Sequence, residues 1–323
     1  MQAYVVGVDL GGTNIKVGLV AVHQGIVHQI SLPTEAEEGP DHVLDQITLG
    51  ILQVQSAIPY GETIRAVGIG SPGAVSWDRT TVHEPPNFPG WHHINMQDAL
   101  RARLGLEIPI VVENDANCAG LGSAFYGAGI PFSSFLMVTL GTGVGGAIIY
   151  QKEIFRGASG GAGEIGHMSI DYEGPWDRAG IPGAPEAYLG QRFLSRHARY
   201  QLLNRTESVI HQMAGEDLLD ITPKMLYDAA LQGDVPAQEV LAWAGHKLGV
   251  TIASAINLLD IRKVIVGGGV SAAGEYILGT ARETMQRFVI AGLRDGVALI
   301  QETLGNEAGI LGAAHLAFQI AKV

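Results

Sequence analysis

The sequence predicts an α/β protein of two unequal domains around a central cleft, and three observations support this fold class. The chain has 323 residues, more than a single hydrophobic core usually needs. Hydrophobic residues make up 47% and charged residues 16%, so a large interior can be buried. A pattern of strand, glycine turn and strand opens the chain at residues 4–22 and returns at residues 135–150.

The first domain is expected to open as a β-meander. Residues 4–8 and 15–22 are apolar strands separated by Gly11-Gly12, and residues 26–32 form a third strand. A helix follows, with Asp41 at the N-cap position. Its apolar face is formed by Val43, Leu44, Ile47, Ile51 and Val54.

Two further strands are predicted at residues 64–69 and 108–112. The segment 70–94 between them is rich in Gly, Pro, Asn and Trp and shows no helical period. Long irregular segments inside compact domains are often functional. A helix of small residues is expected at 115–126.

The second domain becomes mainly helical after Gly190. Its later elements are expected to be a helix capped by Thr222, a long amphipathic helix at 236–259, a strand at 264–266 and a last helix at 306–320. We place the crossover between the domains near Ala116. The smaller domain then comprises residues 1–116 plus 305–323, and the larger comprises residues 117–304 with helical additions.

Charge and cysteine content exclude several classes of protein. Lys and Arg total 20 against 32 Asp and Glu, a net charge of −12, which disfavours binding to nucleic acid or to an anionic membrane. Any bound phosphate must then be held by backbone N–H groups, metal ions or a few local cations. The single cysteine, Cys118, allows no intramolecular disulfide. The N-terminal sequence resembles neither a signal peptide nor a transit peptide, so we expect a cytoplasmic protein.

The two glycine turns are candidate phosphate-binding sites. Glycines allow backbone N–H groups to approach phosphate oxygens, Thr13 adds a hydroxyl, and Asp9 could hold Mg²⁺ through water. Each turn alone could equally be an ordinary tight hairpin. Neither turn contains a Walker lysine. The presence of a strand-flanked Gly/Thr turn in each domain nevertheless indicates phosphate binding more specifically than one such turn alone.

Two segments carry side chains suited to acid–base chemistry or sugar recognition. Asp115, where a strand meets a helix, could accept the proton of an attacking hydroxyl, or it could be a plain N-cap. Glu164 and His167 would share one face of a short helix and could bind sugar hydroxyls. A satisfied buried histidine is the alternative for His167. The other histidines, including His197, show no ligand spacing and receive no role.

With these residues in place, the chain resembles the ROK family, named for repressors, open reading frames and kinases. The match runs from Tyr4 to the last helix. It rests on DLGGTN (residues 9–14), GIGSPG (68–73), the stretch from Asn87 to Gly90-Trp91, ENDAN (113–117), GTGVGG (141–146), GEIGH (163–167) and VGGGV (266–270).

The resemblance implies an actin-like ATPase fold, related to ribonuclease H, with Asp115 as general base toward the 6-hydroxyl of a hexose. The implied sugar-binding residues are Ser71, Gly73, Asn87, Asn114, Asp115, Glu164, His167 and Glu186. The implied ATP-binding residues are Asp9, Gly11, Gly12, Thr13, Asn14, Lys16, Gly141, Thr142, Gly143, Gly268 and Gly269. Asp9 would also hold Mg²⁺.

Glucose is the expected substrate, because Glu186-Ala187-Tyr188 looks like the glucokinase part of the family. N-acetylglucosamine, N-acetylmannosamine, mannose and fructose stay open, as does polyphosphate in place of ATP. We expect a homodimer, the commonest assembly of soluble enzymes. Two other functions were considered. A transcriptional regulator would need a DNA-binding region before the first strand, and a non-catalytic sugar-binding protein would not need Asp115.

One departure from the family pattern is large. The family usually carries three cysteines after GEIGH that hold structural zinc together with the histidine. Here those positions are Asp177, Ala179 and Ala184. Four-coordinate zinc cannot be assembled from His167 and these side chains. We therefore expect a metal-free loop in which His167 keeps only its sugar contact.

Overall fold

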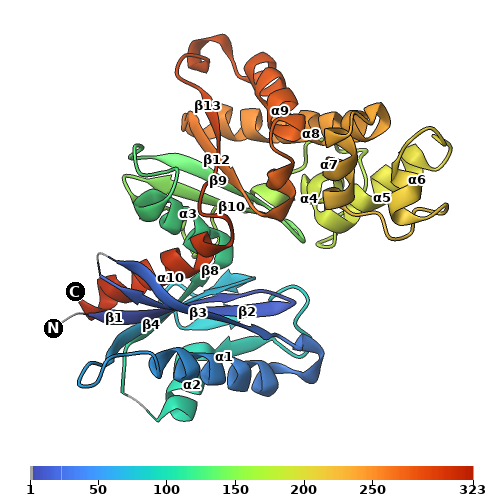
Figure 1. The fold of residues 1–323 in the computed structure, drawn as a ribbon. Helices are drawn as coiled ribbons and strands as arrows, with labels where there is room; N and C mark the ends of the chain where they lie inside the picture. Colours follow the sequence, from blue (N-terminus) through green and yellow to red (C-terminus); the bar gives the residue numbers. More distant parts are fainter. Residues whose placement is uncertain (1–2, 23, 106, 323) are drawn as a thin grey trace. The chain divides into compact units, whose positions relative to one another are not determined.

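The computed structural model describes residues 3–22, 24–105 and 107–322 (Figure 1). Contacts between residues divide the chain into two compact units. Unit 1 comprises residues 1–133, 147–163 and 306–323, and unit 2 comprises residues 134–146 and 164–305. The predicted boundary near Ala116 falls inside helix α3 (Asp115–Tyr126), which groups with unit 1 because it packs against helix α10 (Ala308–Ala321).

Unit 1 contains a five-stranded sheet in the order β3-β2-β1-β4-β8. The strands are β1 (Tyr4–Leu10), β2 (Asn14–Ala21), β3 (Gly25–Pro33), β4 (Ile64–Ser71) and β8 (Ile110–Asn114). The first three are antiparallel, as the predicted meander requires, and β1, β4 and β8 run parallel. Most of β1, β2, β4 and β8 is buried, and these strands form much of the unit 1 core.

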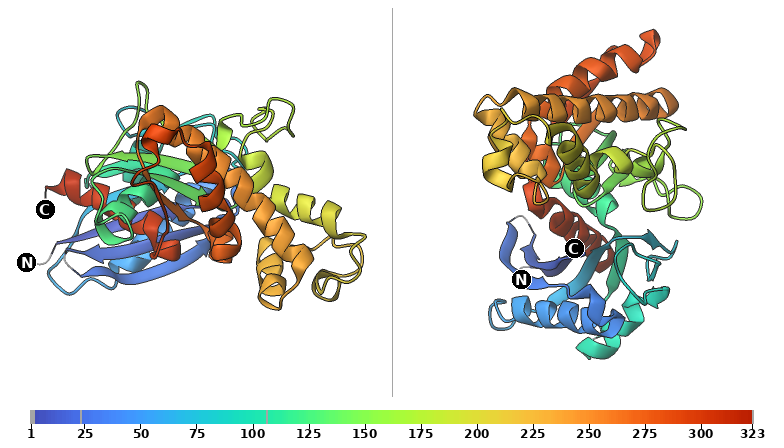
Figure 2. Two further views of the ribbon diagram at one scale, coloured as in Figure 1. Left: turned by 90° about the horizontal axis from the view of Figure 1, so that it is seen from above. Right: turned by 90° about the vertical axis from the view of Figure 1, so that its right-hand side faces the viewer.

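Helices cover both faces of this sheet. Side chains alternate along β2, so Val17 contacts Gly50 of α1 (Pro40–Gln55), whereas Gly18 faces Ile310 of α10. Helix α10 also lies against Gly68 of β4 so closely that an added Cβ would overlap a backbone carbonyl. Figure 2 shows α10 on the face of the sheet opposite α1 and α2 (Met96–Leu104). This tight packing explains why the last helix of the chain is rich in small residues.

Two expectations for unit 1 need correction. Asp41 is not the N-cap of α1; Gly39 holds that position and Pro40 begins the helix. Proline suits the first helical position because its missing N–H is not needed there, and the helix therefore starts two residues earlier than expected. The segment 70–94 is not wholly irregular, since it contains the short strands β5 (Ala74–Val75) and β6 (Thr81–His83). These two strands pair with each other, and β6 also pairs with β7 (His93–Asn95).

The sheet of unit 2 has strand β12 (Lys263–Gly267) between β9 (Phe135–Leu140) and β13 (Ala298–Gln301), parallel to both. Strand β10 (Val144–Tyr150) begins in unit 2 and ends in unit 1, where it pairs with β11 (Glu153–Ile154). Thr222 caps α7 (Pro223–Leu231) as predicted, by accepting a hydrogen bond from the Met225 N–H.

Helices dominate the rest of unit 2. Asp234 caps the long α8 (Val235–Leu259), which begins one residue before the expected start at 236. This helix packs on α9 (Glu275–Phe288) through two glycines. The remaining helices of this unit are α4 (Glu186–Leu189), α5 (Gln191–Leu202) and α6 (Ile210–Ala214). Figure 1 shows α5, α6 and α7 grouped at one end of α8. No helix in the described part of the chain has the length and apolar character needed to cross a membrane.

Candidate active site

Three predicted site residues lie at one edge of the unit 1 sheet. Because β1, β4 and β8 run parallel, their carboxyl ends meet at the same edge. In the strand register Asp9 faces Gly70, and Ser71 faces Asn114. Ligands of open α/β sheets bind where parallel strands end and their loops begin. The topology therefore brings Asp9, Ser71 and Asn114 to an edge that is suited to a binding site.

The turn between β1 and β2 presents exposed backbone. The Gly11 N–H donates to the Asn14 carbonyl across 3.0 Å and closes the turn. Thr34, which is fully buried, donates its hydroxyl to the Gly11 carbonyl at 2.6 Å and holds the turn in place. Gly12 and Thr13 are exposed. Exposed N–H groups and a hydroxyl on a fixed turn are what phosphate oxygens need.

Asp9 and Lys16 form an ion pair beside this turn. Lys16 Nζ lies 3.6 Å from Asp9 Oδ2, and the two residues face each other across β1 and β2. Burial raises the pKa of Asp9, and the neighbouring Lys16 charge opposes part of that rise. Mg²⁺ in kinases usually takes one or two carboxylates beside water and phosphate oxygens. A carboxylate next to a turn predicted to bind phosphate therefore fits the magnesium role predicted for Asp9.

The junction of β8 and α3 separates two roles that the sequence left open. Asn114 is the N-cap of α3, because its Oδ1 accepts from the N–H groups of Ala116 at 3.0 Å and Asn117 at 3.2 Å. Its Nδ2 donates to the Gly73 carbonyl at 3.2 Å. Asp115 is the first helical residue, and its Oδ1 also accepts from Ala116, at 2.8 Å. Since Asn114 supplies the cap, Asp115 stays the candidate general base.

The loops after β4 add Gly73 and Asn87 to the unit 1 group. Both have left-handed backbone, with φ of 87° and 67°. A Cβ on Gly73 would lie 2.8 Å from the Pro85 Cα, so a larger residue does not fit there. A Cβ placed on Gly12 would lie 3.9 Å from that of Asn87. Asn87, predicted to bind sugar, is therefore close to the turn predicted to bind phosphate.

Unit 2 brings its own glycine turn into contact with Glu186. The Gly141 N–H donates to the Gly143 carbonyl at 3.0 Å. Glu186 begins α4, and its Oε2 accepts from the Val144 N–H at 3.2 Å. A Cβ added to Gly143 would overlap that same oxygen. A carboxylate predicted to bind sugar thus lies directly against the turn that includes Gly141, Thr142 and Gly143.

Glu164 and His167 lie one turn apart. The His167 N–H donates to the Glu164 carbonyl at 3.1 Å, in the short 3₁₀ helix η2 (Ile165–His167). Gly166, within this turn, packs on the Val144 carbonyl with no room for a Cβ. Glu164 is exposed, but partial desolvation raises the pKa of its carboxyl group. The interaction with His167 opposes this rise in pKa, and the negative charge of Glu186 adds to it. The three predicted sugar ligands of unit 2 therefore form one group around the glycine turn.

Gly268 lies at the end of β12, next to the same turn. Its φ is 87°, and a Cβ there would overlap the Leu140 carbonyl, so the position requires glycine. Ser271 donates to the Gly268 carbonyl from its N–H at 3.1 Å and from its hydroxyl at 2.7 Å. Gly268 is therefore held beside Leu140, the residue that precedes Gly141, and Gly269 follows it in the chain.

The loop after His167 is held by side-chain and backbone hydrogen bonds. The Asp177 Oδ2 lies 2.7 Å from His167 Nδ1, and its Oδ1 accepts from the Ile181 N–H at 2.8 Å. No group of three or more His, Cys, Asp or Glu side chains in the described residues is arranged to hold a metal ion. Structural zinc needs four ligands, mostly thiolate or imidazole. The side chains present here do not fit it.

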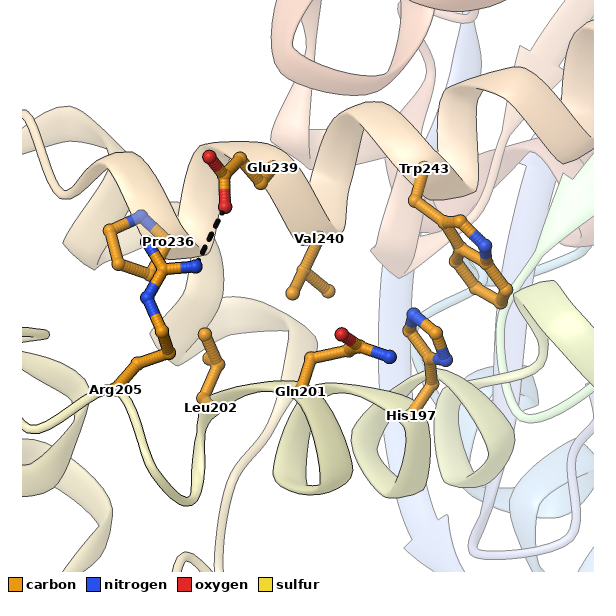
Figure 3. A pocket seen from close by; sticks show the side chains of 8 residues that line it. All are labelled: His197, Gln201, Leu202, Arg205, Pro236, Glu239, Val240 and Trp243. Carbon is orange, nitrogen blue, oxygen red and sulfur yellow. Dashed lines mark hydrogen bonds and ion pairs between the residues drawn. The ribbon is translucent and has the colours of Figure 1, made fainter.

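A separate pocket of about 240 Å³ lies between α5 and α8 (Figure 3). It is lined by His197, Gln201, Leu202, Arg205, Pro236, Glu239, Val240 and Trp243. His197 stacks on Trp243 with ring centroids 3.5 Å apart. Burial and the nearby charge of Lys247 lower the pKa of His197, which favours the neutral ring. We attribute this pair to the packing of α5 on α8, and none of the lining residues is a predicted site residue.

Sequence reasoning missed two residues that support the unit 1 group. Thr34 holds the first glycine turn, but an isolated threonine at the end of a strand gives no local signal of this contact. Glu113 is fully buried and bonded to the N–H of Asn114. The sequence does contain a signal for Glu113, because it is a charged residue at the end of the apolar strand IVVEN. An acidic side chain that is buried in such a strand needs hydrogen-bond or charged partners.

Comparison with known proteins identifies relatives that match nearly the whole chain. The ROK family matches residues 5–320. The glucokinase of Thermotoga maritima is 34% identical, with 96% of each chain covered. The glucokinase of Streptomyces coelicolor is 36% identical, covering 97% of this chain and 96% of its own. A ROK family glucokinase from Streptomyces griseus, solved with glucose and AMPPNP, superposes with a TM-score of 0.87 at 33% identity, covering 98% and 100%.

These matches define an α/β protein of the actin-like ATPase class, and they confirm the predicted fold. The chain belongs to the ROK family. It departs from the family's usual pattern in lacking the zinc cysteines, since Cys118 is its only cysteine. The predicted site residues form two groups, one in each unit, and their individual roles stay predictions.

Proposed function

We propose that this protein is an ATP-dependent kinase that phosphorylates glucose at the 6-hydroxyl. The observation that carries the proposal is the β8–α3 junction, where Asn114 caps the helix and Asp115 is not required for that role. The Thermotoga and Streptomyces glucokinases support glucose as the substrate, since each is similar to this chain over nearly its whole length. The Streptomyces griseus complex, which contains glucose and AMPPNP, supports ATP as the donor.

In this proposal Asp115 accepts the proton of the 6-hydroxyl as that oxygen attacks the terminal phosphoryl group. Phosphoryl transfer depends mainly on positioning and on electrostatic stabilisation, and an aspartate that receives the hydroxyl proton is a recurrent part of it. Carboxylate, imidazole and amide groups are suited to bind several sugar hydroxyls at once. We assign this role to Ser71, Gly73, Asn87, Asn114, Glu164, His167 and Glu186.

The nucleotide phosphates would be held mainly by backbone. The turn at Gly11-Gly12-Thr13-Asn14 and the turn at Gly141-Thr142-Gly143 supply N–H and hydroxyl donors, with Lys16 as a local cation. Gly268 and Gly269 would face the adenosine. Mg²⁺, when bound near Asp9, would neutralise charge on the phosphate oxygens. This division of labour suits a protein with a net charge of −12.

The proposal extends to the oligomeric state and the cellular location of the protein. We propose a homodimer with two-fold symmetry, the commonest state of soluble enzymes. We also propose a cytoplasmic location, which suits an enzyme that uses ATP and contains a single cysteine. Light scattering of the purified protein tests the first statement, and fractionation of cells tests the second.

The decisive experiment is a coupled assay for ADP release with Mg·ATP, run against glucose, mannose, fructose, N-acetylglucosamine and N-acetylmannosamine. Polyphosphate replaces ATP in a parallel series that measures sugar phosphate, because this donor releases no ADP. The Asp115→Asn variant should retain sugar binding and lose roughly 10²–10⁴ in turnover, as expected for loss of a general base. Turnover by the wild type on no sugar, or wild-type-like turnover by the variant, would contradict the proposal.

A further inference from the structure

Glu113 is a buried carboxylate that the proposed reaction does not use. Its side chain has no exposed surface. Burying an ionised carboxylate is costly unless hydrogen bonds and opposite charges compensate for the lost water. Four groups surround it: Arg79 and Arg156 at one oxygen, and the Asn114 N–H and the Asn117 amide at the other.

One oxygen of Glu113 holds both sides of the β8–α3 junction. Oε1 accepts from the Asn114 N–H at 2.9 Å, where the strand ends. The same oxygen accepts from Asn117 Nδ2 at 3.1 Å, in the first turn of the helix. Asp115 lies in the chain between these two bonded residues. Its backbone is therefore fixed from the strand side and from the helix side by a single carboxylate.

The other oxygen of Glu113 is held by two arginines that come from different loops. Arg79 donates from Nε to Oε2 at 2.9 Å, and Arg156 forms an ion pair with Oε2, also at 2.9 Å. The Arg79 carbonyl in turn accepts from the Val112 N–H at 2.9 Å, which ties its turn to β8. The carboxylate therefore cannot rotate away from the junction without losing both charges.

Arg156 also fixes the turn that carries Arg79. Its guanidinium donates to the carbonyls of Trp77 at 2.7 Å and Ser76 at 2.9 Å. It also lies over the Trp77 ring, 5.2 Å from the centroid. Arg156, Arg79 and Glu113 thus form a connected network that reaches from the loop after β11 to the β8–α3 junction.

We propose that Glu113, held by Arg79 and Arg156, is a positioning residue that sets the location of Asp115 for proton transfer. This inference rests on the proposed kinase function. Buried ion pairs contribute little net stability compared with apolar packing, so stability alone does not account for such a network. Placement of a catalytic group does account for it, because a displacement of about 1 Å can cost roughly a hundredfold in rate.

The test compares Glu113→Gln with the wild type in the Mg·ATP assay. The glutamine keeps one carbonyl oxygen, and its amide N–H groups must face donors on one side, either the two arginines or Asn114 and Asn117. We expect kcat to fall roughly ten- to a hundredfold, with the KM for glucose changed by less than about threefold. Arg103→Gln is the matched control, because Arg103 bridges Asp41 and Asp45 at the surface of the same unit; its kcat should be unchanged.

A double variant separates positioning from a merely structural effect. If Glu113 acts through Asp115, adding Glu113→Gln to Asp115→Asn should lower the residual rate no further. Additive losses, or a wild-type kcat in Glu113→Gln, would overturn the inference. If Glu113→Gln does not fold, Arg79→Gln, which leaves Arg156 on the carboxylate, is tested in the same cycle. The wild-type assay separates the two ideas: without wild-type turnover the kinase function fails, whereas turnover with additive losses refutes only the positioning role.

Discussion

His167 and Asp177 form a hydrogen-bonded pair in which Nδ1 and Oδ2 are 2.7 Å apart. The Asp177 side chain is fully buried, whereas the His167 side chain is 30% exposed. Because a carboxylate can only accept, Nδ1 of the ring is the donor in this pair. Asp177 occupies a position where the family pattern has a zinc cysteine. A hydrogen bond here orients the ring that a metal ion would otherwise orient.

Replacing Asp177 should therefore weaken sugar binding more than it slows the chemical step. Asp177→Ala removes the partner of His167 Nδ1 and the acceptor for the Ile181 N–H. We expect the KM for glucose to rise roughly tenfold with a smaller change in kcat, since loss of a partner that orients a binding side chain typically affects function by about 10–100-fold. Ser169→Ala is the control: it removes a bond to the Pro182 carbonyl in the same loop and should leave KM unchanged. An unchanged KM in Asp177→Ala would refute this account.

The same loop should not respond to removal of metal. The described side chains offer no group of three or more metal-ligating residues, and His167 Nδ1 is bonded to Asp177. Dialysis against a strong zinc chelator should therefore leave the melting temperature unchanged, within about 1 °C. A true structural zinc site contributes directly to folding energy, so its loss would lower the melting temperature clearly. Bound zinc in the purified protein together with such a drop would contradict the expectation.

A side chain at Gly143 should displace the Glu186 carboxylate, which occupies that space. An alanine Cβ would overlap Glu186 Oε2, which also accepts from the Val144 N–H. The carboxylate is the mobile partner, so we expect Gly143→Ala to displace it and to raise the KM for both glucose and ATP, with little loss of stability. Gly292→Ala is the matched control, since Gly292 lies in the same unit outside the predicted site and a Cβ there meets no atom within 4 Å. Steady-state kinetics with each substrate varied in turn will show whether the two variants differ.

Local patterns were sufficient to predict much of the fold. The meander, the two glycine turns and the capped helix at Thr222 each depend on residues close together in the sequence, where strand alternation and capping chemistry act. The candidate base was located in the same way, since Asn114 and Asp115 follow an apolar strand directly. The prediction of Asp41 as an N-cap was wrong, because Gly39 caps the helix and Pro40 begins it.

Contacts between distant residues could not be predicted. Arg156 and Glu113 are separated by 42 intervening residues, and the local sequence around either residue does not indicate that they form an ion pair. The strands β5, β6 and β7 are only two or three residues long, too short for an alternation to be visible. The pairing of Asp177 with His167 depends on how a loop folds back, and that is decided by tertiary packing and not by local propensity.

His315 should make the protein sensitive to mild acid. Its ring stacks on Phe125 with centroids 3.8 Å apart, and burial lowers its pKa from 6.5 to about 4. A histidine with a lowered pKa in the folded state contributes stability above its unfolded pKa, and this stability is lost as pH falls toward the folded value. The free energy of unfolding of the wild type should fall by on the order of 2–3 kcal/mol between about pH 6.5 and 4, and His315→Phe should not show this fall. Denaturant unfolding across this range tests it; parallel pH profiles of the two proteins would contradict it.

Asp9 should show the opposite relation between stability and pH, and with it a conflict between stability and function. Its pKa is raised, mainly by burial, so the ionised form costs folding stability once the pH is above the folded pKa. That cost disappears as the pH falls and the carboxyl is protonated in both states. Asp9→Asn should therefore melt higher than the wild type at pH 7, with the difference shrinking toward pH 4.

The kinase activity of Asp9→Asn should nevertheless be lost if Asp9 has its proposed role, because an amide cannot replace a carboxylate that holds Mg²⁺. Lys16→Met gives a control of opposite sign: it leaves the Asp9 carboxylate without the charge 3.6 Å away and should lower the melting temperature at pH 7. Melting curves of the three proteins at several pH values, with turnover measured alongside, test both parts. If Asp9→Asn melted below the wild type at pH 7, the ion pair with Lys16 would outweigh the burial of Asp9, and the carboxylate would be a stabilising group after all.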